Sequence, residues 1–99
     1  MIKRYYVKIY DDDETKTVVS DKTGVITQII IYNDHDENDT NQPTFKLYSD
    51  DYNITFVKKK LEPNETFILK LDTYIEDETI KLYSDLKGVQ LTFNFLEKD

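Results

Sequence analysis

Hydrophobic and polar residues alternate along most of this chain, and the alternation is clearest near its end. Residues 89–95 read VQLTFNF, in which every odd position is apolar and every even position is polar. Successive side chains of a β-strand point to opposite faces, so this period of two predicts a half-buried strand. No stretch of about ten residues has the spacing of an amphipathic helix, and we therefore expect almost no helix.

The same alternation, interrupted by turn residues, predicts seven or eight short strands in total. The other expected strands cover residues 4–10, 17–20, 25–32, 45–48, 54–57, 67–71 and 80–82. Residues 25–32 are apolar on both faces, which favours a central strand covered on two sides. Turn signals recur about every 8 to 12 residues, a pattern typical of an all-β, antiparallel two-sheet β-sandwich of the Ig-like or jelly-roll-like kind.

One face of each expected strand should pack into the core between the two sheets. The residues that we expect there are Val7, Ile29, Ile31, Leu47, Phe56, Leu69, Leu82, Leu91 and Phe93. Turns are a separate question, because the chain has only two glycines and two prolines. Asn and Asp tolerate the left-handed backbone conformation, so we expect them to occupy the turns, and we expect a turn at residues 21–24.

The pentapeptide KLYSD occurs twice, at residues 46–50 and 81–85, and each copy follows an apolar residue that favours strands. Ser and Asp side chains hydrogen-bond nearby backbone groups and so favour a turn over continuation of a strand. We therefore expect each copy to end a strand and to open a hairpin. Chance in a Lys-, Asp- and Tyr-rich chain and duplication of a hairpin explain the repeat equally well.

The length of the chain fits one domain, residues 1–99, which can bury a core without disulfides or metals. Residues 1–15 admit a second interpretation as a peripheral strand or arm. The absence of cysteine excludes disulfides, thiolate zinc sites and cysteine nucleophiles. The chain shows neither a secretion signal nor an apolar run of about 18 residues, so we expect no secretion and no membrane partner.

The formal net charge is −7, from 20 acidic and 13 basic residues. Nucleic-acid binding neutralises phosphates with a basic surface, so we expect no direct nucleic-acid partner. An acidic surface can instead dock on a basic partner or imitate DNA, but the carboxylates bunch at residues 11–14 and 34–39, which is more typical of solvated turns. For the lysine run at residues 58–60 we favour protection of a sheet edge over phosphate binding.

Asp34, Asp36 and Asn38 carry oxygen ligands at alternate positions, as the start of a calcium-binding loop does. The pattern then fails, because the glycine and the final glutamate of such loops are missing and no helix flanks the segment. These three residues are therefore weak metal candidates, and we expect no cofactor. His35 lies among acids in the same loop, where we expect a solvated side chain and not a base or a metal ligand.

The chain is rich in aromatic residues, with eight Tyr and five Phe. Four of the tyrosines fall on the polar side of the expected strands: Tyr6, Tyr10, Tyr48 and Tyr83. Outward tyrosines either pack across neighbouring strands or mark a protein interface, where Tyr is enriched. We take these four as interface candidates.

Four segments follow one another in a recognisable order: TQIIIYN at 27–33, LEPNETFIL at 61–69, IKLYSD at 80–85 and GVQLTF at 88–93. This order resembles that of small β-sandwich proteins of tailed bacteriophage virions. In that family a strand ending in Asn, a Leu-x-Pro-x-Glu-Thr turn and a final alternating strand recur in the same order. The resemblance covers residues from about 18 to 97, and residues 3–14 depart from it.

The resemblance implies a structural protein that acts in multiple copies on the head, neck or tail of a virion. Its implied partners are capsid, portal-side or tail proteins and further copies of itself in a symmetric homo-oligomer, and it would be made in the cytoplasm of the bacterial host. Two other classes stay open: a small acidic inhibitor or anti-defence protein acting on a basic host partner, and a carbohydrate-binding or adhesive module. With one His, no Cys and no glycine-rich phosphate loop, the sequence offers no catalytic constellation, so we expect no enzyme.

Overall fold

The computed structural model describes residues 1–36 and 38–98, and within them it contains six β-strands and no helix. The strands are β1 (Ile2–Lys8), β2 (Glu14–Asn33), β3 (Thr44–Ser49), β4 (Ile54–Lys60), β5 (Thr66–Ser84) and β6 (Val89–Glu97). They form one sheet in the order β1-β6-β2-β5-β3-β4, and every neighbouring pair is antiparallel. The expected all-β, antiparallel architecture is confirmed. Six strands in one sheet take the place of the seven or eight strands in two sheets that we expected.

The lower number of strands arises because β2 and β5 each join two of the expected strands. β2 continues for 20 residues through residues 21–24, so the expected turn there does not reverse the chain. β5 likewise continues for 19 residues and includes both 67–71 and 80–82. The two strands stay paired along this length, with several shifts of register. Residues with turn chemistry therefore make bulges in a continuous ladder.

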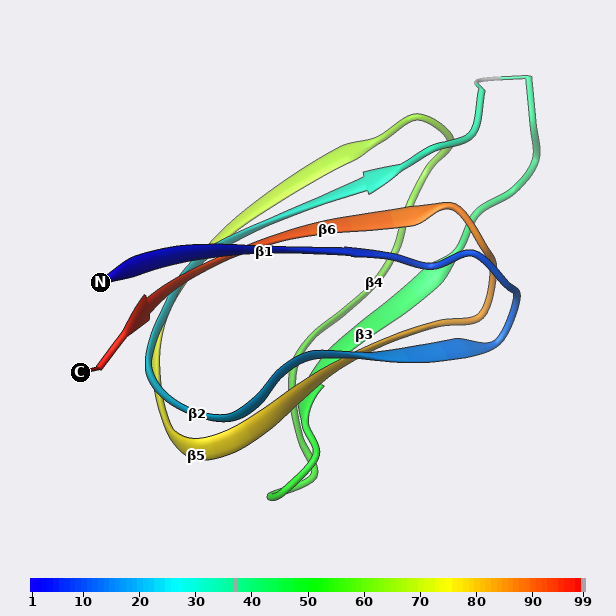
Figure 1. Cartoon of the computed structure of the whole chain (residues 1–99). Helices are drawn as coiled ribbons and strands as arrows, with labels where there is room; N and C mark the ends of the chain where they lie inside the picture. The colour runs from blue at the N-terminus through cyan, green and yellow to red at the C-terminus, as the bar shows by residue number, and fades with distance from the viewer. Residues whose placement is uncertain (37, 99) are drawn as a thin grey trace.

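Both long strands bend, and the bend folds the sheet onto itself (Figure 1). A straight strand of the length of β2 would span about 66 Å, whereas the longest dimension of the molecule is 45 Å. Phe45 pairs with Ser84 at the end of β5, yet its ring lies 6.3 Å from the ring of Phe67 near the start of the same strand. The two ends of β5 therefore face each other across the interior.

The strand registers divide the folded sheet into two halves. The first half consists of β1, β6, residues 25–33 of β2 and residues 66–74 of β5. The second half consists of residues 14–19 of β2, residues 80–84 of β5, β3 and β4. Each half turns one face inward to a common core. We call the opposite face of each half its outer face.

The common core contains most of the residues that the sequence placed there. Six of the nine expected core residues are buried: Ile29, Ile31, Leu47, Leu82, Leu91 and Phe93. The other three, Val7, Phe56 and Leu69, are partly buried against the core. The alternation of inner and outer residues was therefore correct in both halves.

The two copies of KLYSD lie side by side in neighbouring strands. As expected, each copy ends a strand, the first β3 and the second β5. The copies pair with each other antiparallel, and the facing residues are Leu47 and Leu82, Lys46 and Tyr83, and Tyr48 and Lys81. Only the first copy opens a hairpin, with β4. The hairpin expected after the second copy is wrong, because the chain passes there to β6, which pairs with β1 and β2.

Positive φ angles occur at turns and at the bend. Apart from glycine, the described residues with positive φ are all Asp or Asn: Asp13, Asp21, Asn53, Asn64, Asp72 and Asp77. This confirms that Asn and Asp supply the left-handed conformations in a chain with few glycines. Three of them, Asp21, Asp72 and Asp77, lie inside β2 and β5, where they bend the strands instead of reversing them.

Candidate binding surfaces

The outer face of the first half carries two rows of apolar side chains, which we call the apolar rows. Residues directly opposite each other on neighbouring strands share a face, so the register defines each row. From β1 across β6 and β2 to β5, one row is Tyr6, Thr92, Ile30 and Ile68, and the other is Ile2, Leu96, Val25 and Tyr74. A polar row of Arg4, Asn94, Gln28 and Lys70 runs between them.

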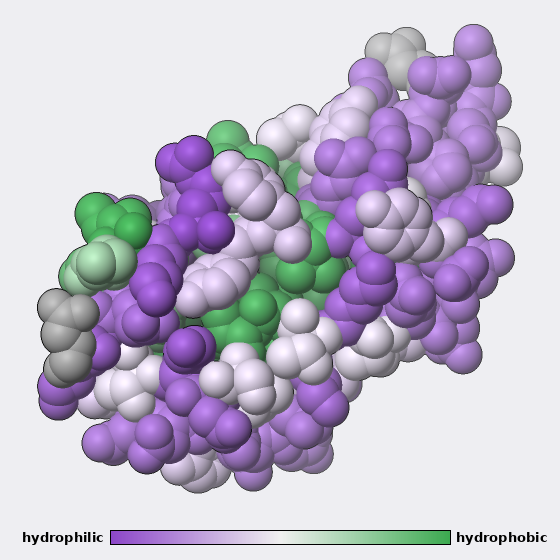
Figure 2. Space-filling view, in the orientation of Figure 1, coloured by the Kyte–Doolittle hydropathy of each residue, from purple (hydrophilic) through white to green (hydrophobic). Residues whose placement is uncertain are grey.

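The apolar rows are exposed at their ends and half-buried in the middle. Tyr6 is 71% exposed and Ile68 is 58% exposed, whereas Ile30 between them is half-buried among its neighbours on the face. No strand of the described residues packs on the rows. Residues 25–32 were expected to be covered on both faces, and this expectation is wrong for the face that carries Ile30. In Figure 2 apolar side chains show in the middle of the view and in a smaller group at the end that holds the two termini, and polar side chains cover the opposite end.

The polar row is held together by hydrogen bonds along the face. Arg4 Nε donates to Asn94 Oδ1 at 3.1 Å, and Asn94 Nδ2 donates to Gln28 Oε1 at 3.4 Å. These contacts fix the side chains between the two apolar rows. The face therefore has an ordered pattern of apolar, polar and apolar stripes.

The outer face of the second half carries a different surface, which we call the Lys–Tyr patch: Lys46, Tyr48, Lys58, Lys81 and Tyr83. The antiparallel pairing of the two KLYSD copies puts the Lys of each copy opposite the Tyr of the other. Lys58 on β4 lies directly opposite Lys46 on β3. The ammonium of Lys46 sits 4.5 Å from the centre of the Tyr48 ring, and Lys81 pairs with Asp50 at 3.1 Å.

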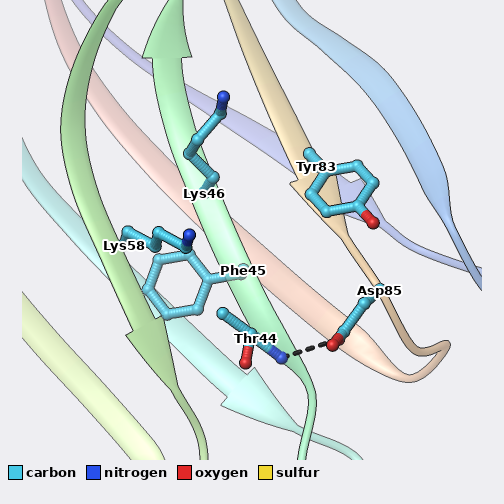
Figure 3. Close-up of a pocket in the computed structure, with 6 residues that line it drawn as sticks. All are labelled: Thr44, Phe45, Lys46, Lys58, Tyr83 and Asp85. Carbon is cyan, nitrogen blue, oxygen red and sulfur yellow. Dashed lines mark hydrogen bonds between the residues drawn. The ribbon is translucent and has the colours of Figure 1, made fainter.

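A shallow pocket of about 320 Å³ opens at one end of the patch, where β3 begins (Figure 3). Its lining residues are Thr44, Phe45, Lys46, Lys58, Tyr83 and Asp85. The backbone N–H of Thr44 donates to Asp85 Oδ1 at 2.7 Å, which ties the start of β3 to the end of β5. In Figure 3 Lys58 and Tyr83 lie on opposite sides of this opening.

Tyr83 forms the side of the patch that faces β2. Its hydroxyl donates to Asp13 Oδ1 at 2.6 Å. This hydrogen bond raises the pKa of the Tyr83 phenol, and partial burial and the negative charges of Asp13 and Asp85 raise it further. The phenol is therefore a neutral donor whose hydrogen is already committed to Asp13.

The four candidate tyrosines lie at three different places on the surface. Tyr48 and Tyr83 belong to the Lys–Tyr patch, while Tyr6 belongs to an apolar row. Tyr10 lies just beyond β1, is largely exposed, and has the ammonium of Lys16 at 4.4 Å from its ring centre. The outward position expected for Tyr6 and Tyr10 agrees with their exposure, and an interface role stays a prediction for all four.

The lysine run at residues 58–60 lies on β4, which is the last strand of the sheet. The alternation of the strand separates the three side chains. Lys59 turns toward β5, where it pairs with Glu65 at 3.4 Å and lies 5.3 Å from the centre of the Phe67 ring. Lys58 and Lys60 face outward, opposite Lys46 and Thr44. These lysines therefore stand at a sheet edge, as expected.

The candidate calcium residues occupy the loop between β2 and β3, in which Glu37 lies outside the described residues. Asp34 pairs with Lys8 at 3.6 Å, and the carbonyl of Asp36 accepts the N–H of Asp39. The side chains of Asp36 and Asn38 are exposed. Within the described ranges, no group of three or more His, Cys, Asp or Glu side chains is placed to hold a metal ion.

His35, which we expected to be solvated, is instead packed, with only 18% of its side chain exposed. Nδ1 lies 3.1 Å from Asp39 Oδ2, and Nε2 lies 3.1 Å from the carbonyl oxygen of Lys87. The ring fits against Gly88, where an added Cβ would be only 2.4 Å from Nε2. His35 therefore fastens the β2–β3 loop to the turn before β6, and the missing side chain at Gly88 makes room for it.

Asn33 is a further residue of this region that pattern reasoning missed. It is fully buried, and its Nδ2 donates to the carbonyls of Asn41 at 3.1 Å and Glu62 at 3.0 Å. The Asn33 side chain thus anchors two segments, the loop between β2 and β3 and the turn before β5. A polar residue at an inner position of an apolar strand was the available signal.

Comparison with known proteins gives no family assignment. No family model matches the chain, and no curated protein matches it. Among solved structures, the crystal structure of FlhE is 9% identical with a TM-score of 0.45, over 95% of this chain and 96% of that one. An acetyl xylan esterase, Est2A, from the rumen bacterium Butyrivibrio proteoclasticus is 16% identical with a TM-score of 0.48, over 100% of this chain and 32% of that one.

A third similar structure is that of infectious bursal disease virus, Gx strain. It is 9% identical with a TM-score of 0.37, over 94% of this chain and 32% of that one. These identities and TM-scores are too low to indicate a shared function. Separately, the described residues contain no helix that is long and apolar enough to cross a membrane.

Proposed function

We propose that this chain is a non-enzymatic structural component of a bacteriophage virion, which assembles in multiple copies on the head, neck or tail. The observation that supports the proposal best is the pair of apolar rows on the outer face of the first half. Antiparallel sheets that face water alternate apolar inner with polar outer residues. Ile30, Ile68 and Tyr74 break that rule on one face, and exposed apolar patches mark protein interaction surfaces.

The character of the face fits a protein partner. Aromatic and aliphatic residues with few charges are typical of the centre of an interface, and a polar stripe within it sets the register of the partner. Acting through this face, the chain would contact other virion proteins, such as capsid, portal-side or tail proteins, and further copies of itself in a symmetric oligomer. It would be made in the host cytoplasm and reside in the virion, without direct contact to nucleic acid or membrane.

The two facing halves of the folded sheet would serve in such an assembly as the two layers of an Ig-like or jelly-roll-like sandwich do. Each half presents its outer face to a neighbour while the common core keeps the domain rigid. Contacts of this kind do not require a catalytic activity. An interface below about 1,000 Å² seldom holds an isolated dimer, so a monomer in dilute solution is compatible with the proposal.

Mass spectrometry of purified particles tests the proposal. We expect the protein in fixed stoichiometry with the major virion proteins. Ile68→Lys and Tyr6→Ala should reduce incorporation without unfolding the domain. Tyr52→Ala is the matched control for Tyr6→Ala, because Tyr52 is 63% exposed, close to the 71% of Tyr6, but lies in the turn between β3 and β4, away from the apolar rows.

Two results would overturn the proposal. One is absence of the protein from the mature particle together with unchanged particle yield when its gene is deleted. The other is equal loss of incorporation for the Tyr6 and Tyr52 variants, which would show that the apolar rows are not the contact.

A further inference from the structure

We propose that the open edge of β4 binds an extended acidic segment of a partner protein, whose carboxylates lie against Lys58 and Lys60 and reach Lys46 behind them. The site uses the second half of the sheet and does not depend on the apolar rows. It would bring a second contact to the assembly proposed above, and either surface can fail while the other stands.

The first argument is the arrangement of charge. The chain is acidic overall, yet 11 of its 13 basic residues lie in strands, and only Lys87 and Lys98 lie outside them. Acidic residues gather instead in turns and at the bend. The net charge of −7 therefore hides sheet surfaces on which lysine is the prevailing charge.

The second argument is the facing pair of Lys46 and Lys58. Like charges directly opposite each other on neighbouring strands destabilise a sheet. Six other lysines have a carboxylate within ion-pair distance: Lys3, Lys8, Lys22, Lys59, Lys70 and Lys81. Within the described part of the chain, neither Lys46 nor Lys58 has such a partner. The ammonium of Lys46 lies 4.5 Å from the centre of the Tyr48 ring, but neither lysine of the pair has a carboxylate among the described residues, and this leaves a place for an external one.

The third argument is the edge itself. β4 is the last strand of the sheet, so the backbone N–H and C=O groups on its free side have no strand partner among the described residues. A peptide that adds to such an edge gains affinity from backbone hydrogen bonds and specificity from alternate side chains. Lys58 and Lys60 are two residues apart and both face outward, so they match a segment with acidic residues at every second position.

The pocket beside Lys46 and Lys58 completes the site. Its volume of about 320 Å³ has room for a side chain beside the two lysines. Asp85 also lines it, but its Oδ1 already accepts the N–H of Thr44, so an incoming carboxylate is matched to the lysine side of the pocket. Lys58 and Lys60 disfavour pairing of β4 with an uncharged or basic strand of another chain and favour pairing with an acidic one.

A nucleic acid is a poorer match for the same lysines. Asp13, Asp50 and Asp85 border the Lys–Tyr patch through their contacts with Tyr83, Lys81 and Thr44. A continuous row of phosphates along the patch would lie close to these three carboxylates and be repelled by them. The carboxylates of an extended peptide are separate side chains, so they can reach individual lysines without approaching the three aspartates.

The experiment titrates the folded protein at low salt with a short peptide that alternates threonine and glutamate. Amide NMR shifts and hydrogen exchange report which strand is contacted. A peptide with lysine in place of every glutamate and a short DNA duplex serve as comparison ligands. We expect the acidic peptide to shift and protect amides of β4 and the other two ligands to leave them unchanged.

Variants then locate the site. Lys58→Glu should weaken peptide binding about tenfold, the scale of one or two surface ion pairs lost and reversed. Because it also relieves the repulsion with Lys46, the same variant should melt about 1–6 °C higher than the parent. Lys70→Glu is the control, since Lys70 is an exposed lysine at an edge of the first half, and it should bind the peptide as the parent does.

Three results would overturn the inference: equal binding of the acidic and basic peptides, binding of the duplex in place of the peptide, or shifts confined to strands other than β4. Unchanged binding by Lys58→Glu would do the same. Ile68→Lys should leave peptide binding intact, so loss of binding in that variant would place the peptide on the apolar rows instead.

Discussion

Replacing Gly24 with alanine should destabilise the fold strongly, because a methyl group there meets the backbone of β6. An ideal Cβ at Gly24 would lie 2.2 Å from the carbonyl oxygen of Leu96 and 3.0 Å from Cα of Glu97. An ordinary contact begins near 3.4 Å, so β6 would have to retreat by about 1.2 Å. The pairs that hold β6 to β2 at this point, Gly24 with Glu97 and Val25 with Leu96, would then separate.

The magnitude follows from two contributions. Overpacking of a tight interior costs about 1–3 kcal/mol, and each hydrogen bond lost from the ladder costs about 1 kcal/mol. We expect a total of about 2–4 kcal/mol, which in a domain of this size lowers the melting temperature by about 8–30 °C. Thermal and urea unfolding followed by circular dichroism measure both quantities.

Gly88 supplies the matched control. Alanine at Gly88 meets the ring of His35, a side chain that can move, and the backbone there has φ of 97°. Removing the ring with His35→Ala should recover part of the stability lost in Gly88→Ala. No such rescue is expected for Gly24→Ala, because its obstacle is backbone. A Gly24→Ala protein that melts within about 2 °C of the parent would refute the close approach of β2 and β6 at the bend.

Four further outcomes are expected. Asn33→Ala should lower the unfolding free energy by about 1–3 kcal/mol in urea titrations, because it removes the buried donor that bonds the carbonyls of Asn41 and Glu62. Asp72→Val should cost about 1–2 kcal/mol while Asp72→Gly costs nothing, since φ there is 48° and only valine is strained. Lys3 donates a hydrogen bond that lowers the pKa of Glu97 below its ordinary value of 4.5, and Lys22 adds to this against the opposing effect of burial. The stability from Glu97 is therefore present above pH 4.5 and lost as the pH falls through the lower folded value; Glu97→Gln should flatten this part of the pH profile of the urea midpoint. Calorimetry with calcium should show no binding tighter than about millimolar, and a micromolar constant abolished by Asp36→Ala would contradict us.

Local pattern was enough to predict the faces of the strands. In β1 and β6 the alternation of apolar and polar residues gave the correct inner and outer sides, and the outward positions of Tyr6 and Tyr10 followed from it. Successive side chains of a strand point to opposite faces, and this holds wherever the strand lies in the sheet. The core residues were therefore accessible from the sequence.

The continuity of β2 and β5 was not accessible in the same way. A left-handed Asp serves a turn and a bulge equally well, so the residues at 21–24 do not reveal whether the chain reverses. That outcome is decided by β5, which carries its own left-handed residues, Asp72 and Asp77, and stays paired with β2 through the bend. The decision rests on a partner about fifty residues away in the sequence.

For the candidate surfaces, too, the local pattern predicted which way a side chain faces but not which side chains come together. The outward side of Tyr48 and of Tyr83 was predicted from each strand alone. Their gathering on one patch depends on the pairing of the two KLYSD copies, and the facing of Lys46 and Lys58 depends on the β3–β4 register. Pairings between distant segments are what a local pattern does not contain.

The pairing of β1 with β6 has a consequence for the order of events during synthesis. Ile2 pairs with Leu96, so the earliest of these six strands to be synthesised has the latest of them as its only sheet neighbour among the described residues. Until β6 emerges, the edge of β1 and the adjoining edge of β2 are both without a partner, and such pairing between distant segments is slow to form. A product that stops before β6 would leave β1 without the strand that pairs with it. Synthesis of β6, more than of any earlier strand, is thus what completes this sheet.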